Sequence, residues 1–105
     1  MASSAGQGRA SPAAIAVKVR WKPAAIRDVM AHASYLEQFN AYAARDLAAT
    51  LFAAGDSLSA LPNRGRHGRI PGTRELLAAA PYVIVYTVEP DKVMILRVWH
   101  GKLLT

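Results

Sequence analysis

The sequence predicts an α+β fold with one strand, an αα-hairpin and then a three-stranded antiparallel meander. We expect the helices to pack on one face of a mainly antiparallel sheet. Two observations predict this order: apolar residues recur at helical spacing in the first half, and β-branched and aromatic runs alternate with turn residues in the second. A length of 105 residues with 52% hydrophobic residues fits one folded domain rather than a disordered chain.

The chain opens with a segment that is unsuited to a core. Residues 1–14 are mostly Ala, Ser and Gly, so we expect a disordered arm followed by a domain over residues 15–105. Apolar and polar residues alternate from Val17 onward, which predicts a half-buried strand with Val17, Val19 and Trp21 on one face.

Two amphipathic helices follow this strand. Pro23 suits the first turn of a helix, and Asn40 is a plausible break between the two helices. The second helix is expected to stop by Pro62. The apolar stripes are Ile26, Val29, Met30, Ala33 and Leu36 in the first helix, and Ala44, Leu47, Leu51, Ala54 and Leu58 in the second.

The second half reads as a glycine-rich loop and three strands. Residues 63–72 hold three glycines and a proline, which excludes regular structure throughout. Strands are predicted over residues 73–77, 82–88 and 93–99. Glu89-Pro90-Asp91 supplies the turn of a hairpin between the last two strands.

Several function classes are excluded by composition. The absence of cysteine removes disulfides, thiolate metal sites and cysteine nucleophiles. Neither a P-loop nor a dinucleotide fingerprint is present, and neither helix carries acids paired with histidine, so we expect no cofactor and no metal. No apolar run approaches the ~20 residues of a membrane span, and no signal peptide is recognisable, so a cytoplasmic protein is expected.

The net charge of +6 is concentrated in one segment. Arg64, Arg66, Arg69 and Arg74 follow one another with no acid until Glu75. Such a cluster suits an anionic partner, although a solvated loop rich in arginine has the same sequence.

The order and spacing of several short motifs resemble a known group of proteins. The motifs are Gly65–Arg69, Gly72–Leu76, Pro81–Tyr86 and Ile95–Gly101. From about Val17 to the C-terminus, the chain resembles the RelE/ParE superfamily of bacterial type II toxins, and most of all its ParE branch. The resemblance implies a toxin that a cognate antitoxin neutralises.

Two activities exist within that superfamily. RelE-like members cut mRNA on the ribosome, whereas ParE-like members poison DNA gyrase. RNA cleavage needs cations and a proton acceptor at the scissile phosphate. At positions where RelE-like ribonucleases carry such groups, this chain keeps Arg74 but has Leu76, Val83 and Leu103, and it ends at Thr105 without a late Tyr. The resemblance therefore implies a gyrase inhibitor and no enzyme; an endoribonuclease and a non-toxic antitoxin-binding homologue are the alternatives.

The expected site residues follow from these considerations. Arg64, Arg66, Arg69, Arg74 and His100 are expected to contact the target. Ala25, Val29, Ala44, Ala48 and Arg97 are expected to contact the antitoxin, a helix of which could lie in an alanine-lined groove between hairpin and sheet.

Structural roles are open for three of these residues. Arg74 could pair locally with Glu75, Arg97 could pair with a buried carboxylate such as Glu75, and His100 could be a structural strand-end residue rather than a base.

The partners that the resemblance implies are a ParD-like antitoxin whose C-terminal segment wraps the toxin, and DNA gyrase as target. Operator DNA would be contacted only through the antitoxin, in a toxin–antitoxin hetero-oligomer. No membrane partner is expected.

Overall fold

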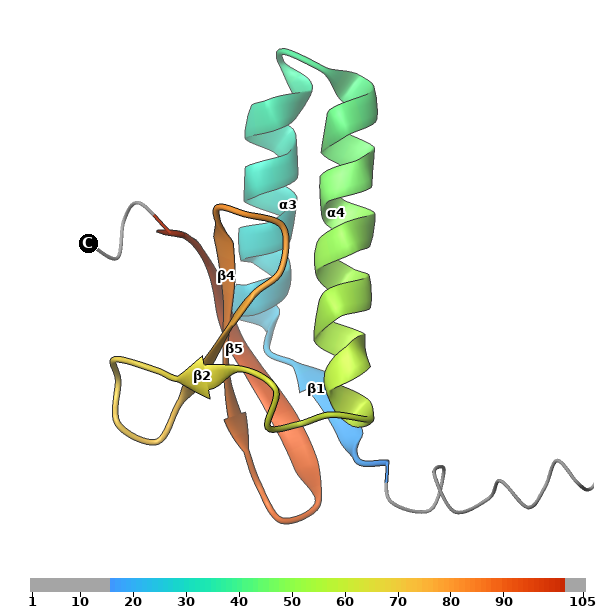
Figure 1. Cartoon of the computed structure of the whole chain (residues 1–105). Helices are drawn as coiled ribbons and strands as arrows, with labels where there is room; N and C mark the ends of the chain where they lie inside the picture. Colours follow the sequence, from blue (N-terminus) through green and yellow to red (C-terminus); the bar gives the residue numbers. More distant parts are fainter. Residues whose placement is uncertain (1–15, 102–105) are drawn as a thin grey trace, which may run out of the picture.

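Two antiparallel helices stand side by side against a twisted sheet in the computed structural model, which describes residues 16–101 (Figure 1). The arm predicted over residues 1–14 lies outside the described residues. The elements are β1 (Lys18–Trp21), α3 (Pro23–Glu37), α4 (Ala41–Asp56), a short 3₁₀ helix η1 (Ser57–Ser59), β2 (Arg66–His67), β3 (Arg74–Leu77), β4 (Tyr82–Val88) and β5 (Lys92–His100). The predicted α+β fold is confirmed.

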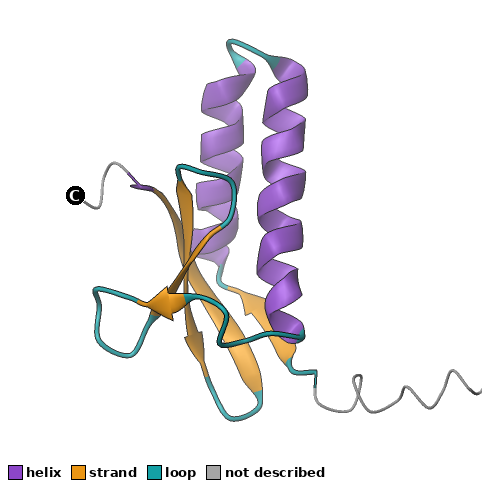
Figure 2. Cartoon of the chain, viewed as in Figure 1, coloured by secondary structure: helices purple, strands orange, loops and turns teal. Residues whose placement is uncertain are grey.

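The described residues form a sheet larger than the predicted meander. Its five strands have the order β1-β5-β4-β3-β2, with β1 parallel to β5 and every other pair antiparallel (Figure 2). The meander β3-β4-β5 is present, and β1 extends it at one edge, next to β5. The helical hairpin that follows β1 carries the chain across to the opposite edge, where β2 and β3 lie. At the other edge, Arg66 and His67 pair with Glu75 and Arg74, which adds a strand of two residues that the glycine-rich sequence concealed.

Local sequence signals define the ends of the helical hairpin. Pro23 occupies the first turn of α3, where its missing N–H costs no hydrogen bond. Asn40 is the N-cap of α4, and its side-chain oxygen accepts a hydrogen bond from the backbone N–H of Ala43 at 2.9 Å. The tip of the hairpin extends beyond the sheet, as Figure 1 shows.

The core lies between the hairpin and one face of the sheet. Its fully buried side chains include Val29 and Leu51 from the helices and Ile84, Tyr86 and Ile95 from the strands. Most of the stripe predicted for the second helix faces this core: Leu47 and Leu51 of α4 and Leu58 of η1 are buried there, and Ala54 packs against them.

The predicted stripe of α3 is partly wrong. Ile26 and Met30 are exposed, whereas Ala25 and Val29 are fully buried. The face of α3 that meets the sheet also carries Asp28, whose carboxylate bonds to β5, so this polar residue occupies a position that the apolar periodicity did not assign to the interface.

Candidate functional site

The arginine-rich segment between α4 and β3 is anchored to the sheet by a buried tyrosine. Tyr86 donates a hydrogen bond from its hydroxyl to the carbonyl of Pro62 at 2.8 Å and accepts one from the N–H of Gly65 at 2.9 Å. Burial raises the pKa of Tyr86. A Cβ at Gly65 would lie 2.7 Å from the Tyr86 hydroxyl oxygen and 2.8 Å from the Glu75 carbonyl oxygen, so only glycine fits this approach.

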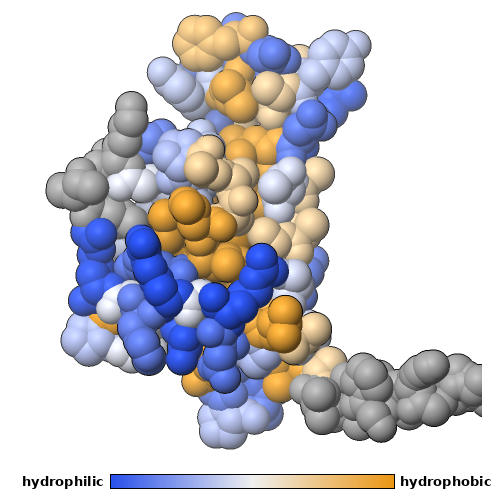
Figure 3. Space-filling model, in the orientation of Figure 1, coloured by the Kyte–Doolittle hydropathy of each residue, from blue (hydrophilic) through white to orange (hydrophobic). Residues whose placement is uncertain are grey.

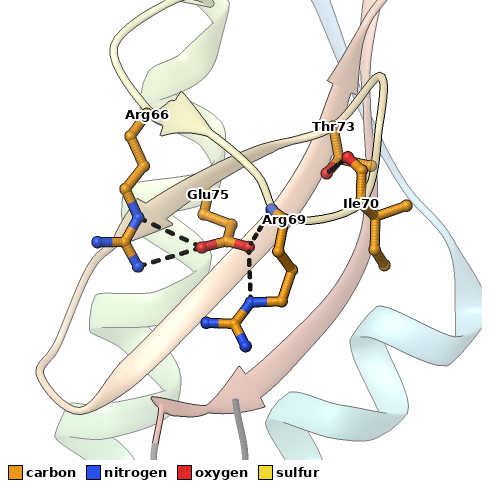
Figure 4. Close-up of polar contacts among 5 residues, drawn as sticks. All are labelled: Arg66, Arg69, Ile70, Thr73 and Glu75. Atoms are coloured by element: carbon orange, nitrogen blue, oxygen red, sulfur yellow. Dashed lines mark hydrogen bonds and ion pairs between the residues drawn. The ribbon is translucent and has the colours of Figure 1, made fainter. Parts of the chain in front are cut away.

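A single buried carboxylate organises the loop that follows. Arg66 and Arg69 lie on either side of Glu75 (Figure 4). Arg66 donates from Nε and Nη2 to Oε1 of Glu75 at 3.3 and 3.1 Å, while Oε2 accepts from the backbone N–H of Arg69 at 3.1 Å and lies 3.7 Å from its Nε. The Glu75 side chain is only 3% exposed, against 68% for Arg66 and 49% for Arg69.

This clasp (Arg66, Arg69 and Glu75) corrects two expectations. Glu75 pairs with Arg66 and Arg69, not with Arg74 or Arg97. The arginine segment is therefore not a run of uncompensated charge, because an acid that follows it in sequence folds back into it. The two guanidinium groups are held in place by the clasp and still present their remaining N–H donors to solvent, which suits them to an anionic surface on a partner.

The other two predicted arginines have different surroundings. Arg74 is partly buried and donates from Nη1 to the carbonyls of Asn63 and Gly65 at 3.2 and 2.7 Å. Arg64 donates to the hydroxyl of Ser57 at 2.8 Å and is exposed. Arg64, Arg66 and Arg69 thus supply the accessible cations, whereas Arg74 supports the loop beneath them. Figure 3 shows hydrophilic residues gathered over the region of β2 and its loops.

A second polar cluster fastens α3 to the end of β5. The carboxylate of Asp28 accepts hydrogen bonds from Nε and Nη2 of Arg97 at 2.7 and 2.9 Å and from the backbone N–H of Val98 at 2.9 Å. One helical turn later, a ring nitrogen of His32 lies 2.8 Å from the carbonyl of Val98. Because β1 pairs with β5 only as far as Ile95, these two side chains bond to a part of β5 that has no β1 neighbour.

The environment of Asp28 determines its charge state. Burial raises the pKa of its carboxyl, but the hydrogen bonds from Arg97 and Val98 and the charge of Arg97 outweigh burial, so the pKa lies below its ordinary value. A carboxyl with a lowered pKa in the folded state stabilises the fold above its unfolded pKa, and this contribution is lost as the pH falls through the folded pKa.

We expect Asp28→Ala to lower the free energy of unfolding by about 2 kcal/mol at neutral pH, because the N–H of Val98 loses its acceptor and Arg97 its partner. The deficit relative to wild type should shrink as the pH falls below about 4, the ordinary pKa of an aspartate in the unfolded chain, and it should be smallest below the lowered pKa of the folded carboxyl. Urea unfolding at several pH values measures it. Asp46→Ala, at an exposed position of α4, is the matched control. A deficit that is independent of pH would contradict this assignment.

His100 packs against aromatic rings and is not recognisable as a general base. Its ring meets Tyr82 edge-on at 5.2 Å between centroids, and Tyr82 in turn lies 4.9 Å from His32. Tyr82 thus contacts both His100, at the end of β5, and His32 of α3. Within residues 16–101, no group of three His, Asp or Glu side chains could hold a metal ion, and no helix is long and apolar enough to cross a membrane.

Of the five residues predicted to meet the antitoxin, Arg97 pairs with Asp28 at the end of β5, and the other four divide into two sets. Ala25 and Val29 are fully buried in the core, because the helices pack directly on the sheet there, so neither side chain lines an open groove between hairpin and sheet. Ala44 and Ala48 instead line a groove of about 430 Å³ between the two helices. Its other lining residues are Met30, Ala33, Ser34, Glu37, Ala41 and Arg45.

Exposed aromatic residues that sequence reasoning missed lie near the tip of the hairpin, and Arg45, which lines the groove, contacts one of them. Tyr35 and Phe39 contact each other edge-on at 5.6 Å, and the guanidinium of Arg45 lies 5.5 Å from the ring of Tyr42. Tyr35, Phe39 and Tyr42 are 66%, 70% and 77% exposed. Their positions near the break at Asn40 were the available signal, since a hairpin tip that extends beyond the sheet cannot bury them.

Known proteins resemble this chain in sequence and in fold. Residues 19–103 match the family described as the ParE toxin of type II toxin–antitoxin system, parDE. The protein Y4kP of Sinorhizobium fredii is 40% identical over 80% of this chain and 88% of its own length. Toxin RelE2 of Caulobacter vibrioides is 39% identical over 80% of this chain and 94% of its own. A chain of the chromosomal ParDE TA system from P. aeruginosa, 19% identical, has the same fold, with a TM-score of 0.72 over 80% of this chain and 95% of that one.

Proposed function

Because this chain belongs to the ParE toxin family of type II toxin–antitoxin systems, we propose that it arrests growth by inhibiting DNA gyrase in the cytoplasm and that a cognate antitoxin neutralises it. The observation that carries the choice of gyrase over mRNA is the burial of Val83. RelE-like ribonucleases carry a cation at the position of this valine, which is 3% exposed. A buried valine can neither neutralise a phosphorane nor move a proton.

Other positions at which RelE-like ribonucleases carry catalytic groups support the same choice. Leu76 is buried in the core, and Leu103 lies outside the described residues. His100, the remaining candidate base, packs against Tyr82. This surface then binds the target and does not cleave a bond. Its contact residues are the exposed cations of Arg64, Arg66 and Arg69.

The antitoxin fits the groove between α3 and α4. Small side chains such as Ala41, Ala44 and Ala48 allow a helix to approach closely, and Met30 offers an apolar contact. The antitoxin is ParD-like, its C-terminal segment wraps the toxin in a hetero-oligomer, and operator DNA is reached only through the antitoxin. Acidic antitoxin side chains would meet the exposed arginines.

An assay with purified components tests the target. We expect the toxin to inhibit DNA supercoiling by gyrase, added antitoxin to reverse the inhibition, and mRNA on programmed ribosomes to remain intact. Inhibition should be lost when cations are removed from the arginine segment but not in Arg27→Gln, which removes a charge from an exposed position of α3. Codon-specific cleavage of mRNA together with unchanged supercoiling would overturn the proposal in favour of a ribonuclease.

A further inference from the structure

A second cationic site lies at the other edge of the sheet, where β1 meets β5. A pocket of about 440 Å³ is lined by Lys18, Arg20, Trp21, Lys22, Pro23, Asp91, Lys92 and Met94. Val93 and Ile95 of β5 point into the core, so Lys92 and Met94 lie on the opposite face, away from the helices. The arginine segment is at the far edge, beyond β5, β4 and β3.

The strand register brings the cations together. Lys18 is the register partner of Lys92 on the neighbouring strand, and Arg20 is the partner of Met94. Residues two apart on a strand share a face at a separation of about 6.6 Å, and paired strands are about 4.8 Å apart. Lys18, Arg20 and Lys92 are therefore neighbours on one surface, and Lys22 follows at the end of β1.

These charges differ from those of the arginine segment because most of them have no carboxylate as an ion-pair partner. Lys92 pairs with Glu89 at 3.0 Å and lies 3.6 Å from Asp91. Among the described residues, no acidic side chain forms an ion pair with Lys18, Arg20 or Lys22. Like charges on facing strands repel one another, so an anionic ligand would relieve a repulsion that the fold leaves in place.

We propose that this pocket binds the sugar–phosphate backbone of a nucleic acid. A phosphodiester chain carries one negative charge per nucleotide, and lysine and arginine side chains spaced along a strand can contact successive phosphates. Met94 and Pro23 add apolar surface against which a sugar or a base can lie. The first turn of α3, which begins at Pro23 beside the pocket, adds the positive end of its helix dipole.

The edge of β1 argues against an acidic peptide as the ligand. A peptide that joins a sheet does so through the free backbone groups of an edge strand. At the start of β1, the N–H of Val17 donates to the carbonyl of Ser59 at 3.0 Å and the Val17 carbonyl accepts from the Ser59 hydroxyl at 2.6 Å. The short helix η1 thus occupies part of this edge. Contacts to phosphates need side chains only, so they are unaffected.

Binding of fluorescein-labelled, mixed-sequence single-stranded DNA to the purified toxin tests the inference by fluorescence anisotropy at several salt concentrations. We expect Arg20→Gln to weaken binding several-fold and to reduce the slope of log K against log [salt] by about 0.7, the value for one phosphate of a single strand. Lys18→Gln, Arg20→Gln and Lys22→Gln combined should reduce it by about 2. Arg27→Gln removes the same charge from α3 and should leave affinity and slope as in wild type.

The controls separate binding at this pocket from a general effect of net charge or of misfolding. Urea midpoints equal to wild type show that the variants are folded. Equal effects of Arg20→Gln and Arg27→Gln would mean that only net charge matters, and would overturn the site. Tighter binding of polyglutamate than of DNA at matched charge and salt would also overturn it, in favour of an acidic protein ligand. The readout involves neither gyrase nor growth, so the result is independent of the target proposed above.

Discussion

Replacing Arg66 and Arg69 with alanine is expected to abolish growth arrest and to lower the free energy of unfolding by about 3 kcal/mol. The loss of stability follows because the Glu75 carboxylate, at 3% exposure, would lose both of its guanidinium partners. Removing one side of a buried ion pair costs about 3–5 kcal/mol, and the exposure of both arginines places the cost at the lower end of that range. Urea unfolding and growth after induced expression measure the two effects.

Adding Glu75→Gln to the same variant separates folding from target binding. The neutral amide still accepts a hydrogen bond from the backbone N–H at position 69, and no buried carboxylate is left without a partner. Most of the lost stability should therefore return. Growth arrest should stay abolished, because the cations that contact the target are still missing. A triple variant that regains both stability and growth arrest would show that Arg66 and Arg69 only support the loop. Arg27→Ala is the control, and His100→Ala should weaken arrest less than the double replacement does.

The second large effect concerns neutralisation by the antitoxin. Ala48→Trp fills the groove between α3 and α4, so we expect antitoxin affinity to fall by about 100-fold or more and co-expressed antitoxin to lose its ability to restore growth. Toxicity without antitoxin should be unchanged, since the groove does not include the arginine segment. Affinity is measured by calorimetry with the purified antitoxin.

Ala53→Trp provides the matched comparison for this experiment. Ala53 is an exposed alanine of the same helix that does not line the groove, so the same side chain there should leave neutralisation intact. Thermal unfolding of both variants checks that α4 still packs on the sheet. If Ala48→Trp is neutralised as well as wild type, the antitoxin binds elsewhere and the groove has another role.

Local signals in the sequence predict the order and the type of most elements. Pro23 and Asn40 mark the starts of the two helices, and the β-branched run over 82–88 coincides with β4. Each of these signals acts locally: a proline suits a first turn, an asparagine side chain caps the N–H groups nearest to it, and a β-branched run favours extended backbone. Such signals can be read without knowing what packs against them.

Which charges are paired and which faces are open depends on how the segments pack together. Glu75 is adjacent to Arg74 in sequence, yet it bonds to Arg66 and Arg69, because β2 runs back along β3. Asp28 bonds to Arg97, which lies nearly seventy positions away in the sequence. Because of this contact, the polar Asp28 of α3 faces the sheet, while the apolar Ile26 and Met30 remain exposed. Periodicity records hydrophobicity along one segment, whereas a buried polar contact depends on a partner that another segment supplies, so its place is settled when the segments meet.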